Sequence, residues 1–567
     1  MEGISPPEDL SALAEEYWEA RLADAPLYAT VIGDRRFDDR LSDISPEGRA
    51  RWGRLLEDVI ARAHGISEEG LREEYRVTRS ALITEAESEL AYLRCGLDEW
   101  SVDPLGGPQV SFLNVESYQT VPTPVEGRAM VARWRAMGPH VDQHIANLRE
   151  SLAAGKVAVR DCVEKVIGEL EDLEGKPANE WPLLKPVAVA HEDWTEAERA
   201  EFREGLTRAV SDSIRPAFGR YVEMLRSELL PRSRPPEMPG IFHVVDGAGA
   251  YRKLIRVYTS LDPSPADIHE TGLREVARIN GEMQALGKEL FGLDDRRAIL
   301  EKLRTDPDLY FTTRDEVAAK AESALARAKA AVPKWFRHLP KAGCVVVRMG
   351  EHEEKHSTIA YYRWPATDGS RPGSFYVNTY APETRPKYEA EALAYHEAIP
   401  GHHLQLALMQ ELTHLPAFRR HSGVTAFIEG WGLYTERLAD EIGLYSSNLD
   451  RMGMLSYDAW RACRLVVDTG MHARGWSRQA AIDFMHENTA LAKNNIVNEV
   501  DRYIAWPGQA LAYKTGQMEI LRLRGEAQRR LGPRFDIRAF HDVVLGNGAL
   551  DLRTLAAMVE AHIASHA

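Results

Sequence analysis

The amino-acid sequence predicts a mainly α-helical protein with one small antiparallel β-sheet. Apolar residues recur at the three- and four-residue spacing of amphipathic helices along nearly the whole chain. Runs of β-branched and aromatic residues, which are typical of strands, are confined to residues 344–380. The chain has 567 residues, and single hydrophobic cores stop growing at about 250–300 residues. We therefore expect a large helical body built in two parts.

Seven stretches before the strand region have the periodicity of amphipathic helices. They are residues 10–23, 46–63, 68–98, 125–154, 161–173, 195–228 and 264–291. Thr195 begins a Thr-Glu-Ala-Glu capping box, a signal for a helix start. The Pro-rich segment 230–240 cannot continue a helix and is the best candidate for a boundary. We expect an N-terminal helical region, residues 1–240, and a C-terminal region, residues 241–567, packed together around a central cleft.

Three short segments have the character of strands. Cys344–Arg348 is a β-branched run, whereas Thr358–Trp364 and Ser374–Tyr380 are aromatic and nearly alternating. A turn-forming segment, Pro365–Gly373, separates the last two and favours a hairpin. From about Lys387 the chain is helical again. We therefore expect a small antiparallel sheet directly before the motif helix described below, where an aromatic strand could hold an extended peptide.

Composition and charge exclude several classes of protein. The formal net charge of −16 argues against nucleic-acid binding, which depends on Lys and Arg contacts with phosphates. The sequence contains no run of about 18 apolar residues, so it predicts no membrane-spanning helix. The first residues lack the basic and apolar regions of a secretory signal. We expect a cytoplasmic protein with neither a nucleic-acid nor a membrane partner, and no particular oligomeric state is predicted. Four widely separated cysteines are typical of free thiols: Cys95, Cys162, Cys344 and Cys463.

The octapeptide His396-Glu-Ala-Ile-Pro-Gly-His-His403 is the motif that indicates chemistry. A hydrolytic zinc site needs two neutral imidazoles on one ion and a carboxylate beside the water that the ion activates. In the common His-Glu-x-x-His helix, the glutamate follows the first histidine directly. His396 and Glu397 match that part of the pattern. We therefore predict that His396 binds zinc and that Glu397 is the general base.

The second histidine comes later than in the common pattern. His402 is six residues after His396, which an unbroken helix would place on another face; His403 is seven residues after, about 10.5 Å further along the axis. Pro400 removes an N–H group and Gly401 tolerates unusual backbone angles. Together they can bulge the helix and bring His402 back over His396. We favour His402 as the second metal ligand and keep His403 as the alternative.

A candidate for the third ligand lies on the next predicted helix. Glu429 is surrounded in sequence by apolar residues that include Phe427 and Trp431, and a buried carboxylate is costly unless it is paired or on a metal. We predict that Glu429 completes the metal site. Glu436, seven residues on and on the same face, would suit a role in holding the N–H of a ligating histidine. Its simpler role is a surface pair with Arg437.

Three motifs taken together resemble the DUF885 family of bacterial proteins. They are the His396–His403 core, the Glu429–Trp431 segment and the late block Trp506–Ala510. Similar segments at Ala29–Gly33 and Phe535–His541 extend the likeness over nearly the whole chain. The resemblance implies a mostly helical, metallopeptidase-like fold, similar to the glutamate-zincin type of zinc metallopeptidase, in which a glutamate on the following helix is the third ligand.

Two late segments contain candidates for binding substrate or stabilising a developing oxyanion. His472 follows Asp468 by four residues on a predicted helix, and Tyr513 could donate its hydroxyl. Arg502 or Lys514 could bind a substrate carboxylate. Each also fits a simpler role: Asp468 and His472 as a pair on a helix surface, Tyr513 in packing, and Arg502 as the partner of nearby acidic residues.

These features predict a hydrolase with one Zn²⁺ ion, and they leave the substrate open. One hypothesis is a peptidase that acts on short peptides. Another is an amidase or other hydrolase that acts on a peptide-like metabolite. A third is a helical binding protein without activity, although binding alone needs no base such as Glu397. Ligation by two histidines and a glutamate suits zinc and is also compatible with cobalt or manganese.

Overall fold

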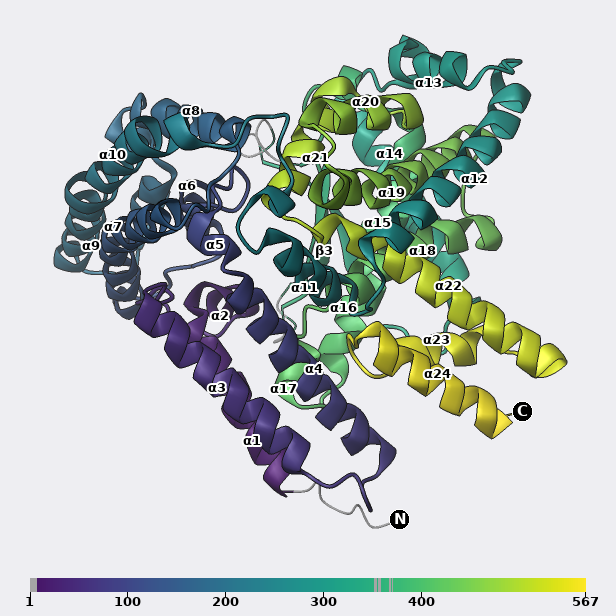
Figure 1. The fold of residues 1–567 in the computed structure, drawn as a ribbon, viewed down its shortest axis with the longest axis horizontal. Helices are drawn as coiled ribbons and strands as arrows, with labels where there is room; N and C mark the ends of the chain where they lie inside the picture. Colours follow the sequence, from purple (N-terminus) through teal and green to yellow (C-terminus); the bar gives the residue numbers. More distant parts are fainter. Residues whose placement is uncertain (1–7, 351–353, 355–357, 367–368, 370, 567) are drawn as a thin grey trace. The chain divides into compact units, whose positions relative to one another are not determined.

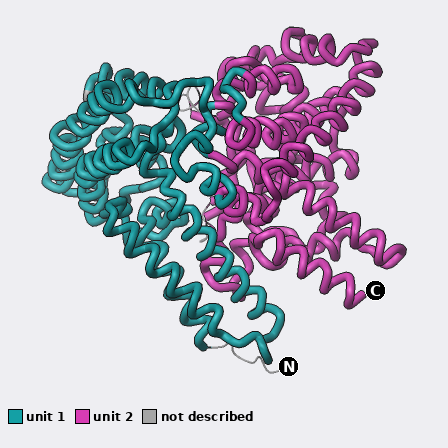
Figure 2. Tube along the Cα trace, in the orientation of Figure 1, with its two compact units in different colours: residues 1–253, 475–479, 501–506 teal, residues 254–474, 480–500, 507–567 magenta. Residues whose placement is uncertain are grey.

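The structure is a computed structural model that describes residues 8–350, 354, 358–366, 369 and 371–566. The chain forms two compact units, which Figure 2 distinguishes by colour. The boundary expected at residue 240 lies inside unit 1. Within the described ranges, none of the helices combines the length and the hydrophobicity that a membrane span requires. Unit 1 comprises residues 1–253, 475–479 and 501–506, and unit 2 comprises residues 254–474, 480–500 and 507–567.

Up to Thr259 the described chain is largely helical (Figure 1). The capping box predicted at Thr195 is present. The predicted helix 195–228 is one helical run in which π-helical turns, at Ala209–Ile214 and Leu225–Leu229, interrupt the α-helical pattern. The α-helices are α1 (Glu8–Asp24), α2 (Pro26–Ile32), α3 (Pro46–Gly65), α4 (Glu73–Cys95), α5 (Leu97–Trp100), α6 (Pro108–Asn114), α7 (Pro124–Ala153), α8 (Arg160–Glu174), α9 (Glu196–Arg208), α10 (Arg215–Met224) and α11 (Gly247–Thr259).

Unit 1 packs around buried aromatic side chains. Trp134 of α7 is fully buried, and its indole N–H donates a 3.0 Å hydrogen bond to the backbone oxygen of Leu183. The ring of Trp181, also fully buried, stacks on Phe218 of α10 at a centroid distance of 6.2 Å. Aromatic rings bury more apolar surface than other side chains, so this cluster holds the helices of unit 1 together.

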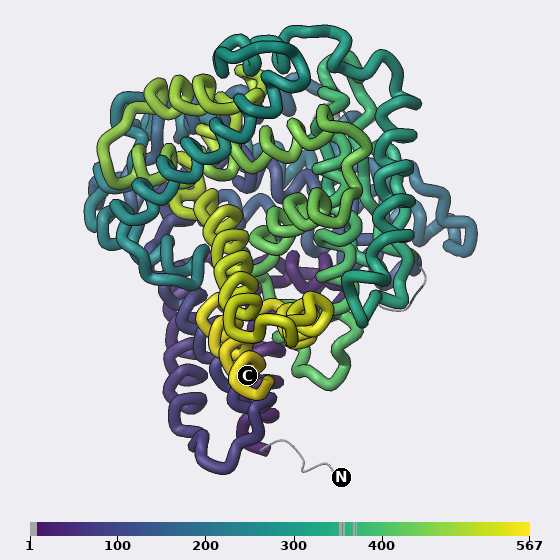
Figure 3. The backbone as a smooth tube through the Cα atoms, turned by 90° about the vertical axis from the view of Figure 1, so that its right-hand side faces the viewer, coloured from purple at the N-terminus to yellow at the C-terminus, as the bar shows by residue number. Residues whose placement is uncertain are grey.

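Unit 2 contains the predicted motif and the remaining elements, except that the first residues of α20 and the last residues of α21 belong to unit 1. Its longest helices, α12 and α19, pack closely. Gly272 permits this approach, since a Cβ there would lie only 2.8 Å from the side chains of Leu465 and Val466. Gly430 of α18 and Gly516 of α22 allow a similar approach, and α22 runs beside α24 in Figure 3. The helices are α12 (Pro265–Phe291), α13 (Arg296–Thr305), α14 (Arg314–Ala331), α15 (Ala390–Glu397), α16 (His402–Glu411), α17 (Ala417–Arg420), α18 (Thr425–Ile442), α19 (Asn448–Arg474), α20 (Arg478–Asn488), α21 (Lys493–Ala505), α22 (Ala512–Leu531), α23 (Ile537–Leu545) and α24 (Leu552–His566).

The three predicted strands form one sheet in the order β1-β3-β2. β2 (Ala360–Arg363) and β3 (Gly373–Val377) pair antiparallel, as expected of the hairpin. The prediction of a purely antiparallel sheet is wrong, because β1 (Cys344–Arg348) runs parallel to β3. A parallel pair needs a crossover connection, and here the segment that contains β2 supplies it. α14 packs against β1 and β3, and α15 against β2, so the sheet lies beside the motif helix (Figure 1).

Candidate metal centre

The motif helix is broken at the position where Pro and Gly predict a bulge. α15 ends at Glu397 and α16 begins at His402, with a cis peptide bond between Ile399 and Pro400 in the connection. Gly401 passes so close to the preceding helical turn that a Cβ there would overlap the backbone oxygen of His396. A continuous helix would place His396 and His402 on different faces. Because the helix is broken between them, their rings meet edge to face with a centroid distance of 4.7 Å.

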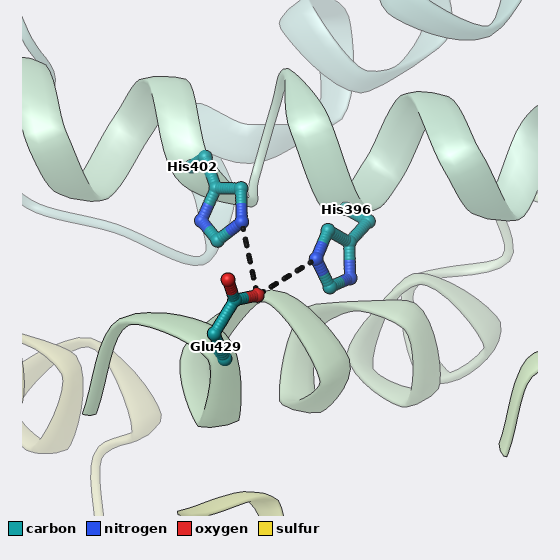
Figure 4. Close-up of side chains that lie close together, drawn as sticks. All are labelled: His396, His402 and Glu429. Atoms are coloured by element: carbon teal, nitrogen blue, oxygen red, sulfur yellow. Dashed lines mark ion pairs between the residues drawn. The ribbon is translucent and has the colours of Figure 1, made fainter. Parts of the chain in front are cut away.

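Three side chains from three helices meet in one place, as Figure 4 shows. The ligand atoms of His396, His402 and Glu429 all lie within 4.8 Å of one another. Oε2 of Glu429 is 3.5 Å from Nε2 of each histidine. Tetrahedral zinc with bonds of about 2.0–2.1 Å places its ligand atoms about 3.3–3.4 Å apart. The observed separations suit a shared ion better than direct hydrogen bonds, so these residues fit a metal ion.

His396 is held in place from behind by α18. Its Nδ1 lies 2.8 Å from Oε1 of Glu436, which is buried. Gly432, between Glu429 and Glu436 on the same helix face, makes room for the ring, because a Cβ there would lie 2.7 Å from Cε1 of His396. The predicted contact between Glu436 and a candidate ligand histidine is therefore present. With Nδ1 occupied, Nε2 is the nitrogen that faces the centre.

The charges of the centre are strongly coupled. Burial lowers the pKa of His396, but Glu429 and Glu436 outweigh this effect and raise the pKa to about 9. Burial raises the pKa of Glu429, whereas its interactions with the two imidazoles hold the pKa well below its usual range. Burial also raises the pKa of Glu397, and the imidazoles of His402 and His396 partly offset this effect. The centre therefore has compensating charges, as buried ionic groups require.

His403 lies outside the metal centre. Its Nδ1 is 2.9 Å from the hydroxyl of Tyr362 in β2, and its Nε2 is 3.1 Å from the backbone oxygen of Ala342. Burial lowers its pKa to about 4, so the ring is neutral and can donate one hydrogen bond and accept the other. Both ring nitrogens are thus engaged in fixing α16 to the sheet region. The alternative in which His403 supplies a metal ligand has no support in this geometry.

The other predicted site residues have contacts with residues outside the three-residue cluster. Asp468 accepts hydrogen bonds from the backbone N–H of Gly508 on both carboxylate oxygens, at 3.2 Å. His472 is fully buried in α19 and is not a member of the cluster. The ring of Tyr513 lies 4.4 Å from the guanidinium of Arg464.

The two predicted carboxylate binders each have other contacts. The ammonium of Lys514 is buried and lies 2.6 Å from Asp458 and 3.1 Å from Glu275. Arg502 belongs to unit 1, where its guanidinium lies 5.3 Å from the ring centre of Trp506. Lys514 is therefore committed to structural ion pairs, and the cluster itself belongs to unit 2.

Sequence reasoning missed one group of residues on α19. Tyr457, Trp460 and Arg461 are buried and lie on one face of this helix at positions i, i+3 and i+4. The signal that could have identified them is the i, i+3, i+4 spacing of two aromatic residues and one basic residue within one helical segment. We call these three residues the α19 triad.

The fold and the side chains define a mainly helical protein with a candidate metal centre of two histidines and one glutamate. Residues 26–559 match the family described as "Bacterial protein of unknown function (DUF885)". The chain belongs to this DUF885 family. No curated protein matches it.

Two solved structures are similar over almost their entire length. One is described as the putative lipoprotein from Colwellia psychrerythraea, with a TM-score of 0.91, 27% identity, and coverage of 98% of this chain and 99% of the other. The second, described as a putative lipoprotein of unknown function from Shewanella oneidensis, has a TM-score of 0.77, 17% identity, and coverage of 98% and 100%. The second likeness concerns the fold alone.

Proposed function

We propose that this protein is a zinc-dependent hydrolase, specifically a peptidase that cleaves short peptides. The observation that supports this proposal most directly is the convergence of His396, His402 and Glu429 beside Glu397. Two imidazoles and one carboxylate form a donor set that suits zinc, with one coordination position left for chemistry. The order of these residues in the chain is also that of the glutamate zincins, which the proposal takes as its closest analogy.

Each side chain of the centre has a distinct role in this proposal. His396, His402 and Glu429 would hold the ion, which when bound supplies Lewis acidity and lowers the pKa of water. Glu397 takes a proton from the attacking water and passes it to the leaving amine. Glu436 fixes the ring of His396 and increases its basicity as a ligand. A binding protein would need the ligands alone, so the position of Glu397 favours hydrolysis.

A cavity in unit 2 supports a small substrate. It has a volume of about 840 Å³, within the range of small-molecule and cofactor sites. Its lining includes Glu389 and Leu393, on the segment that leads into His396, and Tyr457 and Trp460 of α19, whereas Glu397 and the three candidate metal ligands are not among the lining residues. A space of this size suits a peptide of a few residues and is too small for a folded protein.

The proposal predicts zinc and peptide hydrolysis together in the purified protein. We expect about one equivalent of zinc per chain by mass spectrometry, and cleavage of unblocked peptides in a library of two to six residues. Removal of the metal with a chelator should abolish cleavage, and one equivalent of zinc should restore it. If the zinc-loaded protein cleaves no peptide in the library, the proposed peptidase activity would be contradicted and the amidase alternative would remain. A protein without metal affinity would contradict both.

The charge of Glu436 should strengthen metal binding. We expect Glu436→Gln to lower the affinity for zinc by about 10- to 100-fold, since the neutral amide makes His396 a weaker ligand. Competition with a chromophoric chelator measures this affinity. The matched control is Glu441→Gln on the same helix, because Glu441 pairs with Arg524 at 2.6 Å outside the centre and its loss should leave zinc affinity unchanged. Equal affinities in the two variants would contradict this role of Glu436.

A further inference from the structure

Arg461 is a buried cation without an acidic partner. Its side chain is only 6% exposed, and neither Nε nor Nη1 has a hydrogen-bond partner. An unpaired charge in this setting is costly. Three other basic residues of unit 2 have acidic partners: Arg464 lies 2.8 Å from Glu499, Arg437 lies 2.5 Å from Asp458, and Lys514 lies 2.6 Å from Asp458. Arg461 differs from these three residues in having two nitrogens available for a ligand.

The α19 triad holds this guanidinium in a fixed plane. The guanidinium carbon of Arg461 lies 4.6 Å from the ring centre of Tyr457 and 4.2 Å from that of Trp460. Stacking on aromatic rings orients the planar group and leaves its edge free for hydrogen bonds. The hydroxyl of Tyr457 is also buried and has no partner. The triad thus offers the guanidinium N–H groups of Arg461 and the hydroxyl of Tyr457 as unused donors on one face of α19.

The face of α19 that holds these donors is turned towards the motif segment. The hydroxyl of Ser456, the residue before Tyr457, donates a 3.0 Å hydrogen bond to Glu389, seven residues before His396. The positive charge of Arg461 lowers the pKa of both Glu389 and Glu397, against the effect of burial. Tyr457 and Trp460 also line the cavity described above. Tyr457 therefore lies at the cavity, and Arg461 lies near enough to Glu389 and Glu397 to affect both carboxyl groups.

We propose that Arg461, with the hydroxyl of Tyr457, binds the free C-terminal carboxylate of a peptide substrate. A guanidinium edge and a hydroxyl match the two oxygens of a carboxylate. The nearby acids Glu389 and Glu397 would oppose a dianion such as phosphate. This assignment rests on the proposed function and restricts it, because a carboxylate anchored close to the general base makes the enzyme a carboxypeptidase.

The test compares peptides that differ only at the C-terminus. We expect the wild type to cleave N-acetylated tripeptides with a free carboxylate at a kcat/KM about 10- to 100-fold above that of their amides. Arg461→Gln should reduce this ratio to about one, mainly through KM, and Arg461→Lys should retain part of it. Because both peptides are measured on one preparation, the ratio is independent of the folded fraction. Arg451→Gln, which removes an arginine of the same helix that pairs with Asp440 at 2.7 Å, should keep the wild-type ratio.

A binding measurement separates this inference from the proposed function. Calorimetry with Glu397→Gln should show tighter binding of the free-acid tripeptides than of the amides, and Glu397→Gln combined with Arg461→Gln should show no difference. If Glu397→Gln binds the free acids more tightly but the wild type hydrolyses no peptide, the result would contradict the proposed peptidase and support the carboxylate site. Hydrolysis with equal rates for acids and amides would overturn the carboxylate site alone. An equal loss of both activities in Arg461→Gln, with the ratio preserved, would also overturn it.

Discussion

Glu397→Gln should abolish peptide hydrolysis and leave zinc in place. The amide has nearly the shape of the carboxylate but cannot accept a proton, and general acid–base catalysis contributes about 10²–10⁴-fold to a rate. Glu397 is not among the three side chains whose ligand atoms converge, so its neutralisation removes no metal ligand. We expect kcat to fall by that factor while one equivalent of zinc is retained, measured by steady-state kinetics and metal analysis of the same sample.

The control for this variant is another glutamate that lies just after the motif. Glu411, at the end of α16, accepts a 2.7 Å hydrogen bond from the backbone N–H of Lys341 and is not a member of the metal cluster. Glu411→Gln should keep its activity within about twofold, since surface-type substitutions have small effects. If Glu397→Gln were as active as this control, the base would have to be another residue.

Much of the fold can be predicted from the sequence because it depends on local patterns. Apolar periodicity predicts the long helices, and the capping box at Thr195 predicts the start of α9. Strand direction is a different kind of information. The hairpin of β2 and β3 follows from the turn between them, whereas the parallel pairing of β1 with β3 depends on where a crossover places β1. Neither β-branched composition nor alternation contains that information.

The metal centre was partly predictable for a related reason. The seven-residue spacing of Glu429 and Glu436 puts both on one helix face, and both face His396 in the structure. The choice between His402 and His403 depended on how the chain turns at Pro400, which spacing alone does not determine. It is resolved by the broken helix and by the partners of His403.

The arginine of interest was not predictable from the sequence. Arg502, Lys514 and Arg461 are all basic residues in late helical segments, and sequence does not show which of them has an acidic partner. Lys514 proves to be paired, and Arg502 belongs to unit 1. Arg461 is distinguished only by the absence of a partner for Nε and Nη1, which is a property of tertiary packing.

His396→Ala and Glu429→Ala should each lose zinc. Loss of a group that hydrogen-bonds to a metal ligand already lowers metal affinity about 10- to 100-fold. Loss of a ligand itself should therefore lower metal affinity by well over about 100-fold. We expect metal content to fall from about one equivalent to near zero after dialysis, and hydrolysis to be lost with it. Full zinc in both variants would end the assignment of these residues as ligands, whatever their activity.

The decisive control for the metal variants is the other histidine of the motif. His403→Ala removes a buried ring that bonds to Tyr362 and to the backbone oxygen of Ala342, so we expect lower thermal stability but one equivalent of zinc. His402→Ala should show the reverse, with zinc lost and the unfolding temperature of the metal-free protein little changed, because Nδ1 of His402 has no hydrogen-bond partner. Loss of zinc from His403→Ala alone would transfer the second ligand to His403. The two adjacent histidines thus differ in what they hold: one faces the ion, and the other fixes the helix that presents it.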